Sequence, residues 1–277
     1  MEDNSKAILV PVDFTPAASQ AAISAAELAA KLNAEVHLIN FIPPIDSKIL
    51  NHSGNVSDVS EELSSSINLL KENEQKLAEF AKSIELPEVK VFPEIVMERF
   101  VPGLKKQLKK KNIGLVVIGI NGIRSIGESL YHTKYASDLV KLKCPLMICN
   151  GHEHHFQGKH RLVVSLDFDD LDQNNIEYID YIARELDVKV HYLHVNHPED
   201  KKQCTVHDIE QYLKAHNLHA ESIDIIDSEH KEEAIRHYAH DHNADLIAIN
   251  KINRKSEFKE CHAEQMVDES ESLVFVY

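Results

Sequence analysis

The sequence predicts an α/β fold that is built twice, as two tandem, open, doubly wound sheets of five parallel strands related by a pseudo-two-fold axis. Short, nearly continuous apolar runs are typical of strands that are buried on both faces. Segments with helical periodicity alternate with these runs, which is the order of βαβ units. The same order of elements then occurs a second time along the chain.

The repeat is clearest at the start of each half. Residues 8–14 (ILVPVDF) align with residues 162–168 (LVVSLDF) at an offset of 154, and the alignment continues without a gap to residue 41. Seven of the 34 aligned positions are identical. Both segments consist of an apolar run that ends in Asp, a helical stretch of about 16 residues and a second apolar run, which is a βαβ unit.

The ends of the halves correspond as well. Residues 113–119 (IGLVVIG) align with residues 244–250 (ADLIAIN) at an offset of 131, and each half closes on a short apolar run, at 146–149 and 273–276. Each half is therefore expected to hold five strands and four helices. The segments between these blocks are expected to form a helix at 57–84, a strand at 88–94 and a helix at 99–111, with shorter counterparts at 203–216, 219–227 and 229–242.

We expect a first domain over residues 1–150, a polar and His-rich linker over 151–159, and a second domain over 160–277. The domains are called the first half and the second half below.

Charge and composition exclude several classes of protein. The net charge of -15 is that of an acidic chain and argues against a nucleic-acid binder. It is uneven, because residues 1–158 carry 17 basic and 19 acidic side chains whereas residues 159–277 carry 13 and 26. No apolar run reaches the roughly 20 residues that span a bilayer. The polar N-terminal segment and four cysteines without a CxxC pair predict a cytoplasmic protein with reduced thiols and no membrane partner.

The candidate site follows from where such sheets bind ligands, at the carboxyl ends of the strands where the strand order reverses. Asp13 ends the first apolar run and places a carboxylate at that edge. Gly119 and Gly122 follow the fourth run, and His132 and Thr133 open the next helical stretch. A glycine turn that leads to a helix N-terminus offers free N–H groups to an anion.

With these residues the chain resembles the universal stress protein family, whose nucleotide-binding members carry Gly-x2-Gly-x9-Gly-[Ser/Thr] after a strand of the Val-Pro-Val-Asp kind. The resemblance covers nearly all of both halves and implies the layering of the adenine nucleotide alpha hydrolase-like and flavodoxin-like folds. It further implies that the closing strands, at 146–149 and 273–276, pair with each other within the chain, which would protect exposed sheet edges. It also implies that Pro11, Val12 and Asp13 face a nucleoside, and that the backbone near Phe41 faces the adenine.

For the phosphates, the resemblance implies that Gly119 and Gly122 bracket them and that Thr133 supplies a hydroxyl. The third glycine of the family is replaced by His132. One interpretation is that its side chain blocks the site, because a Cβ is costly where φ is positive. The other is that His132, as an imidazolium, contacts phosphate and makes affinity depend on pH. Asp13 and the glycine turn also have purely structural interpretations, as a turn or N-cap residue and as a strand-to-helix connection.

The second half departs further, because all eight glycines lie in residues 1–158. Asn250 and Asn253 replace the first two motif glycines, and Ala263-Glu264 replaces His132-Thr133. A glutamate at the phosphate end repels the ligand. We therefore expect ATP or AMP, with Mg²⁺, only in the first half.

Three functions remain open from the sequence. The first is a stress-response regulatory protein that binds an adenine nucleotide in the first half. The second is a signalling adaptor or scaffold that binds no nucleotide and acts by self-association or through an unidentified protein partner. The third, ranked last, is a nucleotide hydrolase, since only Asp13 is nominated as a general base. No catalytic or metal-binding residue is predicted.

Overall fold

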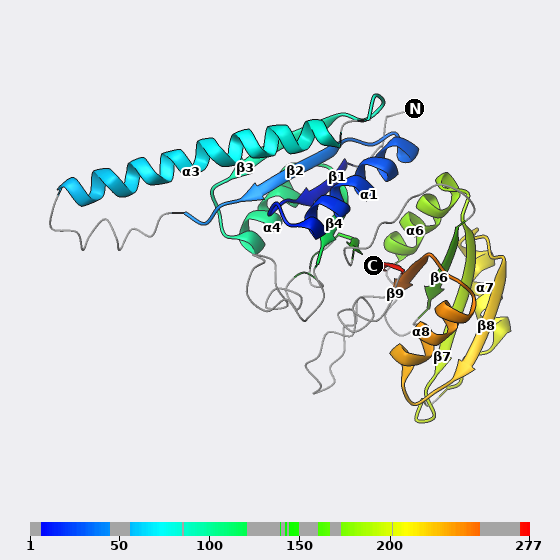
Figure 1. The fold of residues 1–277 in the computed structure, drawn as a ribbon. Helices are drawn as coiled ribbons and strands as arrows, with labels where there is room; N and C mark the ends of the chain where they lie inside the picture. Colours follow the sequence, from blue (N-terminus) through cyan, green and yellow to red (C-terminus); the bar gives the residue numbers. More distant parts are fainter. Residues whose placement is uncertain are drawn as a thin grey trace.

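The computed structural model describes residues 7–44, 56–84, 86–120, 139, 142, 144–149, 160–166, 173–200, 202–249 and 272–277. Its first half contains strands and helices in alternation from the amino end (Figure 1). In chain order they are β1 (Ala7–Pro11), α1 (Pro16–Leu32), β2 (Val36–Phe41), α3 (Val56–Ser83), β3 (Val91–Val96), α4 (Phe100–Lys110), β4 (Ile113–Gly119) and β5 (Leu146–Cys149).

The second half repeats this order. Its elements are β6 (Arg161–Ser165), α6 (Gln173–Glu185), β7 (Lys189–Asn196), α7 (Val206–Ala215), β8 (Ser222–Asp227), α8 (Lys231–Asp241), β9 (Leu246–Ile249) and β10 (Leu273–Val276). The predicted fold class is thereby confirmed. The third strand of the first half is shifted, since it was expected at 88–94 and lies at Val91–Val96. The fourth helix expected in each half falls outside the described residues.

The ten strands form one sheet in the order β3-β2-β1-β4-β5-β10-β9-β6-β7-β8. Strands within each half are parallel, whereas β5 and β10 pair antiparallel, with Ile148 opposite Val274. This confirms the expected pairing of the closing strands and joins the two predicted sheets into one. In each half the strand order reverses between the first and fourth strands, which is the point at which open α/β sheets bind ligands.

Helices cover both faces of the sheet, and the buried apolar residues form one cluster on each face. One cluster combines α1 and α3 of the first half with α6 and α7 of the second half. The other combines α4 with α8. Helices α1 and α6 also contact each other across the junction of the halves, whereas the outer end of α3 extends beyond the sheet (Figure 1). The core is therefore continuous between the halves.

The alanine-rich helix α1 shows how local sequence sets this packing. Thr15 is its N-cap and accepts a hydrogen bond from the N–H of Ala18 at 3.3 Å, and Pro16 occupies a favourable first-turn position. Asn33 ends the helix in a left-handed conformation with φ 50°. The small side chains of α1 let its backbone lie close to β1 and β4, which determines the shape of the candidate site.

The repeat extends to individual hydrogen bonds. Asn33 corresponds to Asp187 at the offset of 154, and both have positive φ. The N–H of Val12 donates to the carbonyl of Ile39, and the equivalent N–H of Leu166 donates to the carbonyl of Leu193. The two halves thus share backbone geometry at the carboxyl ends of their first two strands.

Candidate functional site

The candidate site of the first half lies at the carboxyl ends of β1 and β4, where the strand order reverses. Pro11 and Val12 are buried at the end of β1, and Asp13 follows them in a partly exposed position. Gly119 ends β4, the neighbouring strand, and Phe41 ends β2 on the other side of β1. The structure thus brings these five predicted site residues to one edge of the sheet.

Asp13 organises the turn that connects β1 to α1. Its Oδ1 accepts hydrogen bonds from the backbone N–H of Thr15 at 3.1 Å and from the Thr15 hydroxyl at 2.6 Å. Asp13 is therefore a turn residue, and the N-cap role belongs to Thr15. Phe14, between them, has φ 64°, a left-handed conformation that is uncommon for a bulky side chain. The carboxylate still lies partly exposed at the edge where a ligand would approach.

Gly119 is required by packing before any ligand is considered. A Cβ at this position would lie 2.0 Å from the carbonyl oxygen and 2.2 Å from the carbonyl carbon of Ala17, which is backbone of α1. Only glycine lets β4 and α1 approach this closely. Gly119 thus has a structural role in the contact of β4 with α1, which differs from the expected strand-to-helix connection, and it does not by itself argue for phosphate binding.

The side chain of Phe41 packs in the core of the first half. It is only 3% exposed, and its ring lies edge-on to Phe100 at a centroid distance of 5.6 Å. The ring also packs against Gly103 of α4, where a Cβ would lie 2.7 Å from Cδ1. Any ligand contact at this position therefore falls to the backbone of Phe41, as the resemblance implied.

Asn40 is a polar residue of the site that the sequence interpretation did not single out. It is 3% exposed, and its Nδ2 donates a hydrogen bond of 2.7 Å to the carbonyl of Val12. Among the described residues, its Oδ1 has no hydrogen-bond partner. The signal was present in the sequence, since Asn40 is a polar residue in a buried strand and aligns with His194 at the offset of 154.

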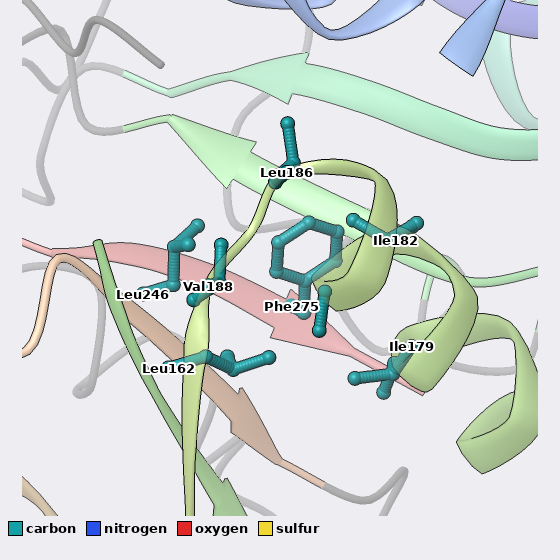
Figure 2. Close-up of a pocket in the computed structure, with 8 residues that line it drawn as sticks. Leu162, Ile179, Ile182, Leu186, Val188, Leu246 and Phe275 are labelled. Carbon is teal, nitrogen blue, oxygen red and sulfur yellow. The ribbon is translucent and has the colours of Figure 1, made fainter. Parts of the chain in front are cut away.

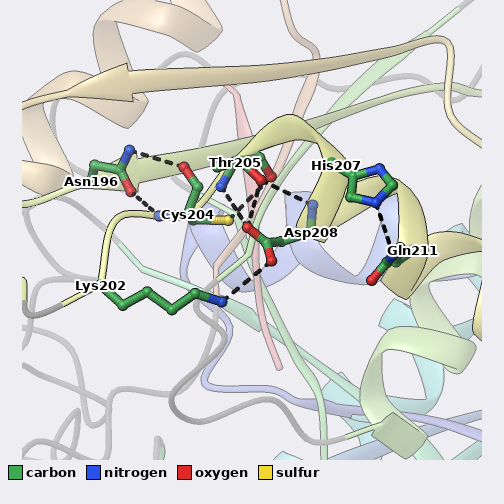
Figure 3. Close-up of polar contacts among 7 residues, drawn as sticks. All are labelled: Asn196, Lys202, Cys204, Thr205, His207, Asp208 and Gln211. Carbon is green, nitrogen blue, oxygen red and sulfur yellow. Dashed lines mark hydrogen bonds and ion pairs between the residues drawn. The ribbon is translucent and has the colours of Figure 1, made fainter.

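The corresponding edge of the second half is shaped differently. His194 Nδ1 lies 2.8 Å from the carbonyl of Leu166, which repeats the Asn40–Val12 contact. Asn196 then makes two hydrogen bonds to the backbone of Cys204, at 2.9 and 3.3 Å (Figure 3). These two hydrogen bonds fix the connection between β7 and α7.

Helix α7 begins with a capping box between Thr205 and Asp208, and Lys202 reaches the same carboxylate (Figure 3). These hydrogen bonds lower the pKa of Asp208 to about 2, with the Thr205 hydroxyl as the largest cause. Polar groups near this edge of the second half therefore bind one another, and none of these contacts presents a phosphate cradle.

The sequence of the first half matches a known protein family. The model of the universal stress protein family matches residues 4–150, which is more than half of the chain. The chain belongs to the universal stress protein family. The match falls on the half that retains Asp13 and Gly119.

Solved structures agree with this at the level of the fold. A universal stress protein from Archaeoglobus fulgidus DSM 4304 matches with a TM-score of 0.72 and 18% identity, over 100% of this chain and 98% of that one. A functionally unknown protein, PA1789, from Pseudomonas aeruginosa PAO1 matches with a TM-score of 0.59 and 15% identity, over 98% of this chain and 92% of that one. No curated protein sequence shows significant similarity. The structural matches extend over both halves, as expected for a tandem universal stress protein.

Part of the predicted site lies outside the described residues. This applies to Gly122, His132 and Thr133 of the first half, and to the second-half positions 167, 250, 253, 263 and 264. The His-rich tract at 151–159 is also outside. The roles given to these positions by the family resemblance remain predictions.

Within the described part of this universal stress protein, the other candidate sites are few. No group of three or more His, Cys, Asp or Glu side chains is arranged to hold a metal ion there. No helix in the same residues is long and apolar enough to cross a membrane. A small apolar cavity lies between α6 and the sheet of the second half, with Phe275 beside it (Figure 2). Its volume of about 10 Å³ is at the lower limit for a single water molecule, so it is a packing defect and not a ligand site.

Proposed function

We propose that this universal stress protein is a cytoplasmic regulatory protein that binds ATP or AMP, with Mg²⁺, at the carboxyl edge of the first half. The observation that carries the proposal is the placement of Asp13 and Gly119 at the ends of β1 and β4, where the strand order reverses. Ligands of open α/β sheets bind at such a point. Asp13 would accept hydrogen bonds from ribose hydroxyls, and the turn that begins at Gly119 would meet the phosphates.

Calorimetric titration with ATP and with AMP, each with and without Mg²⁺, tests the proposal. One nucleotide per chain is expected. Asp13→Asn should weaken binding by about tenfold, because a hydrogen bond to a charged acceptor contributes about 1.5 kcal/mol or more. The matched control is Asp167→Asn at the offset of 154, which should leave affinity unchanged because it alters the second half. Equal effects of the two substitutions would contradict the proposed location.

A second variant tests the phosphate end of the site. Gly122→Trp should abolish binding by filling the predicted turn, and binding that survives it would mean that the phosphates lie elsewhere. Titration of the wild type between about pH 5.5 and about pH 8 tests the proposed imidazolium role of His132. Affinity should rise as pH falls if the charged ring contacts phosphate, and a flat profile would remove that role.

The alternative function is an adaptor that binds no nucleotide and acts through self-association or another protein. The packing role of Gly119 favours it, since this glycine is needed without any ligand. Failure of the wild type to bind ATP or AMP would support the adaptor over the nucleotide-binding protein. Light scattering at high protein concentration then distinguishes an adaptor that self-associates from one that binds another protein. A strict monomer would leave only a different protein as the partner.

A further inference from the structure

The buried amide of Asn40 has a definite structural task at the candidate site. Its Nδ2 donates to the carbonyl of Val12, the residue that directly precedes Asp13. The hydrogen bond spans two strands and is buried, so water does not compete with it. Asn40 therefore fixes the point at which the chain leaves β1 and enters the turn to α1.

That turn needs to be held. Phe14 adopts φ 64°, and for a residue other than glycine such a conformation is costly unless surrounding contacts impose it. Asp13 and Thr15 tie the turn together from one side through their side chains. At the end of β1, the Asn40–Val12 hydrogen bond adds a buried side-chain contact to the backbone hydrogen bond from Val12 to Ile39.

The repeat identifies which part of this arrangement is retained when the residue changes. His194 occupies the equivalent position, and its Nδ1 lies 2.8 Å from the carbonyl of Leu166, the equivalent of Val12. Two different side chains thus contact equivalent backbone carbonyls in the two halves. Only the amide adds a buried acceptor, Oδ1, that has no partner among the described residues. An unsatisfied buried acceptor is destabilising, so an asparagine at this position has a cost that a histidine avoids.

We propose that Asn40 is a positioning residue of the nucleotide site, which holds the turn at residues 12–14 so that the Asp13 carboxylate faces the ligand. The inference rests on the proposed function and adds to it a residue that acts through Asp13 without touching the nucleotide. It predicts that the donor to the Val12 carbonyl matters and that the identity of the side chain does not.

Three variants of the full chain test this by calorimetric titration with ATP and Mg²⁺. Asn40→Leu removes the donor at similar volume and should weaken binding by about tenfold, the equivalent of one buried hydrogen bond. Asn40→His places at this position the residue found in the second half and should restore affinity to within about twofold of the wild type. His194→Leu is the matched control in the second half and should leave affinity unchanged. If Asn40→His binds as weakly as Asn40→Leu, the proposal is wrong.

A double-mutant cycle separates positioning from a general effect on the fold. In an Asp13→Asn background, Asn40→Leu should cost less than about twofold, because the group that it positions is already lost. Two losses that multiply would overturn the proposal, since they would mean that Asn40 acts independently of Asp13.

Amide hydrogen exchange tests the positioning role of Asn40 even if the wild type binds no nucleotide. Such a lack of binding would refute the proposed function, whereas the exchange rates report on the turn itself. The N–H groups of Thr15 and Ala18 are held by this turn, so Asn40→Leu should speed their exchange and Asn40→His should not. Unchanged exchange in Asn40→Leu would show that Asn40 does not position the turn, whatever the ligand.

Discussion

At the scale of single residues, Gly119 has a packing role that is separate from the phosphate contact implied by the family resemblance. Its missing side chain lets α1 lie against β4. A glycine to which the resemblance assigns a phosphate contact is thus a packing requirement of this fold. Loss of ligand binding on mutation of Gly119 would therefore not by itself identify a phosphate contact.

Gly119→Ala is expected to destabilise the protein by about 3 kcal/mol or more, because the new Cβ meets backbone atoms of Ala17 that move only with the helix. Chemical denaturation measures this. The comparison is Gly103→Ala in α4, whose Cβ would meet the buried ring of Phe41, a side chain that can shift without moving backbone. That substitution should destabilise by no more than about 2 kcal/mol, because overpacking costs about 1–3 kcal/mol and the helix propensity of alanine returns about 1 kcal/mol. Similar losses for both would contradict the distinction between backbone and side-chain contacts.

The half-buried His191 of β7 provides a prediction about pH. Burial is the main cause that lowers its pKa below 6.5, and repulsion by His242 and Arg161 adds to it against the opposing effect of Glu221 and Asp224. The unfolded chain therefore binds a proton that the folded chain does not. The contribution of neutral His191 to stability is therefore complete above about pH 6.5 and is lost as the pH falls below that value.

His191→Gln should accordingly reduce the loss of stability on acidification from about pH 7 to about pH 5. Denaturation of both proteins at each pH measures the difference. His37, the equivalent residue of the first half, also has a pKa lowered mainly by burial and next by Lys111. His37→Gln should have an effect of the same sign. If either variant lost more stability than the wild type on acidification, the histidine would have to gain a proton on folding.

At the scale of elements, the repeat predicted which segments form strands and helices, and the structure has them in the expected order. The bounds of β3 differ from the expected 88–94, because β3 contains Pro93. Strands tolerate proline at a sheet edge, where β3 lies, but proline interrupts the apolar pattern from which strand bounds are predicted. The contact of Asn40 with Val12 was not predicted, because it joins residues that lie 28 apart and depends on strand register. The approach of α1 to Gly119 depends on helix orientation, which periodicity does not give.

The small cavity beside α6 gives a prediction at the same scale. The cavity between α6 and the sheet is lined by apolar side chains, including Val188 and Ile182 (Figure 2). Val188→Ile adds one methylene group beside it and should raise the free energy of unfolding by up to about 0.8 kcal/mol. Val163→Ile is the control, because Val163 is fully buried and a larger side chain there should be neutral or destabilising. Stabilisation by both would mean that the cavity is not the cause.

At the scale of the whole molecule, the antiparallel pairing of β5 with β10 makes one sheet of two halves. A closing strand left unpaired would expose a hydrogen-bonding edge, and the tandem chain covers both such edges internally. The two apolar clusters cross the same junction, each with residues from both halves. The sequence predicted the strand pairing but gave no indication that the cores also merge, because that depends on helix contacts such as α1 with α6.

A continuous core predicts that the halves unfold together, in a single calorimetric transition whose van't Hoff and calorimetric enthalpies agree. Val274 lies in β10 between β5 and β9 and is fully buried. Val274→Ala should lower the midpoint of that one transition by about 5 °C, for a loss of about 2 kcal/mol. Ile67→Ala, on the part of α3 that lies in solvent, should leave it unchanged, since Ile67 is 44% exposed. Two resolved transitions, with only one of them shifted by Val274→Ala, would mean that the halves are energetically independent despite the shared sheet.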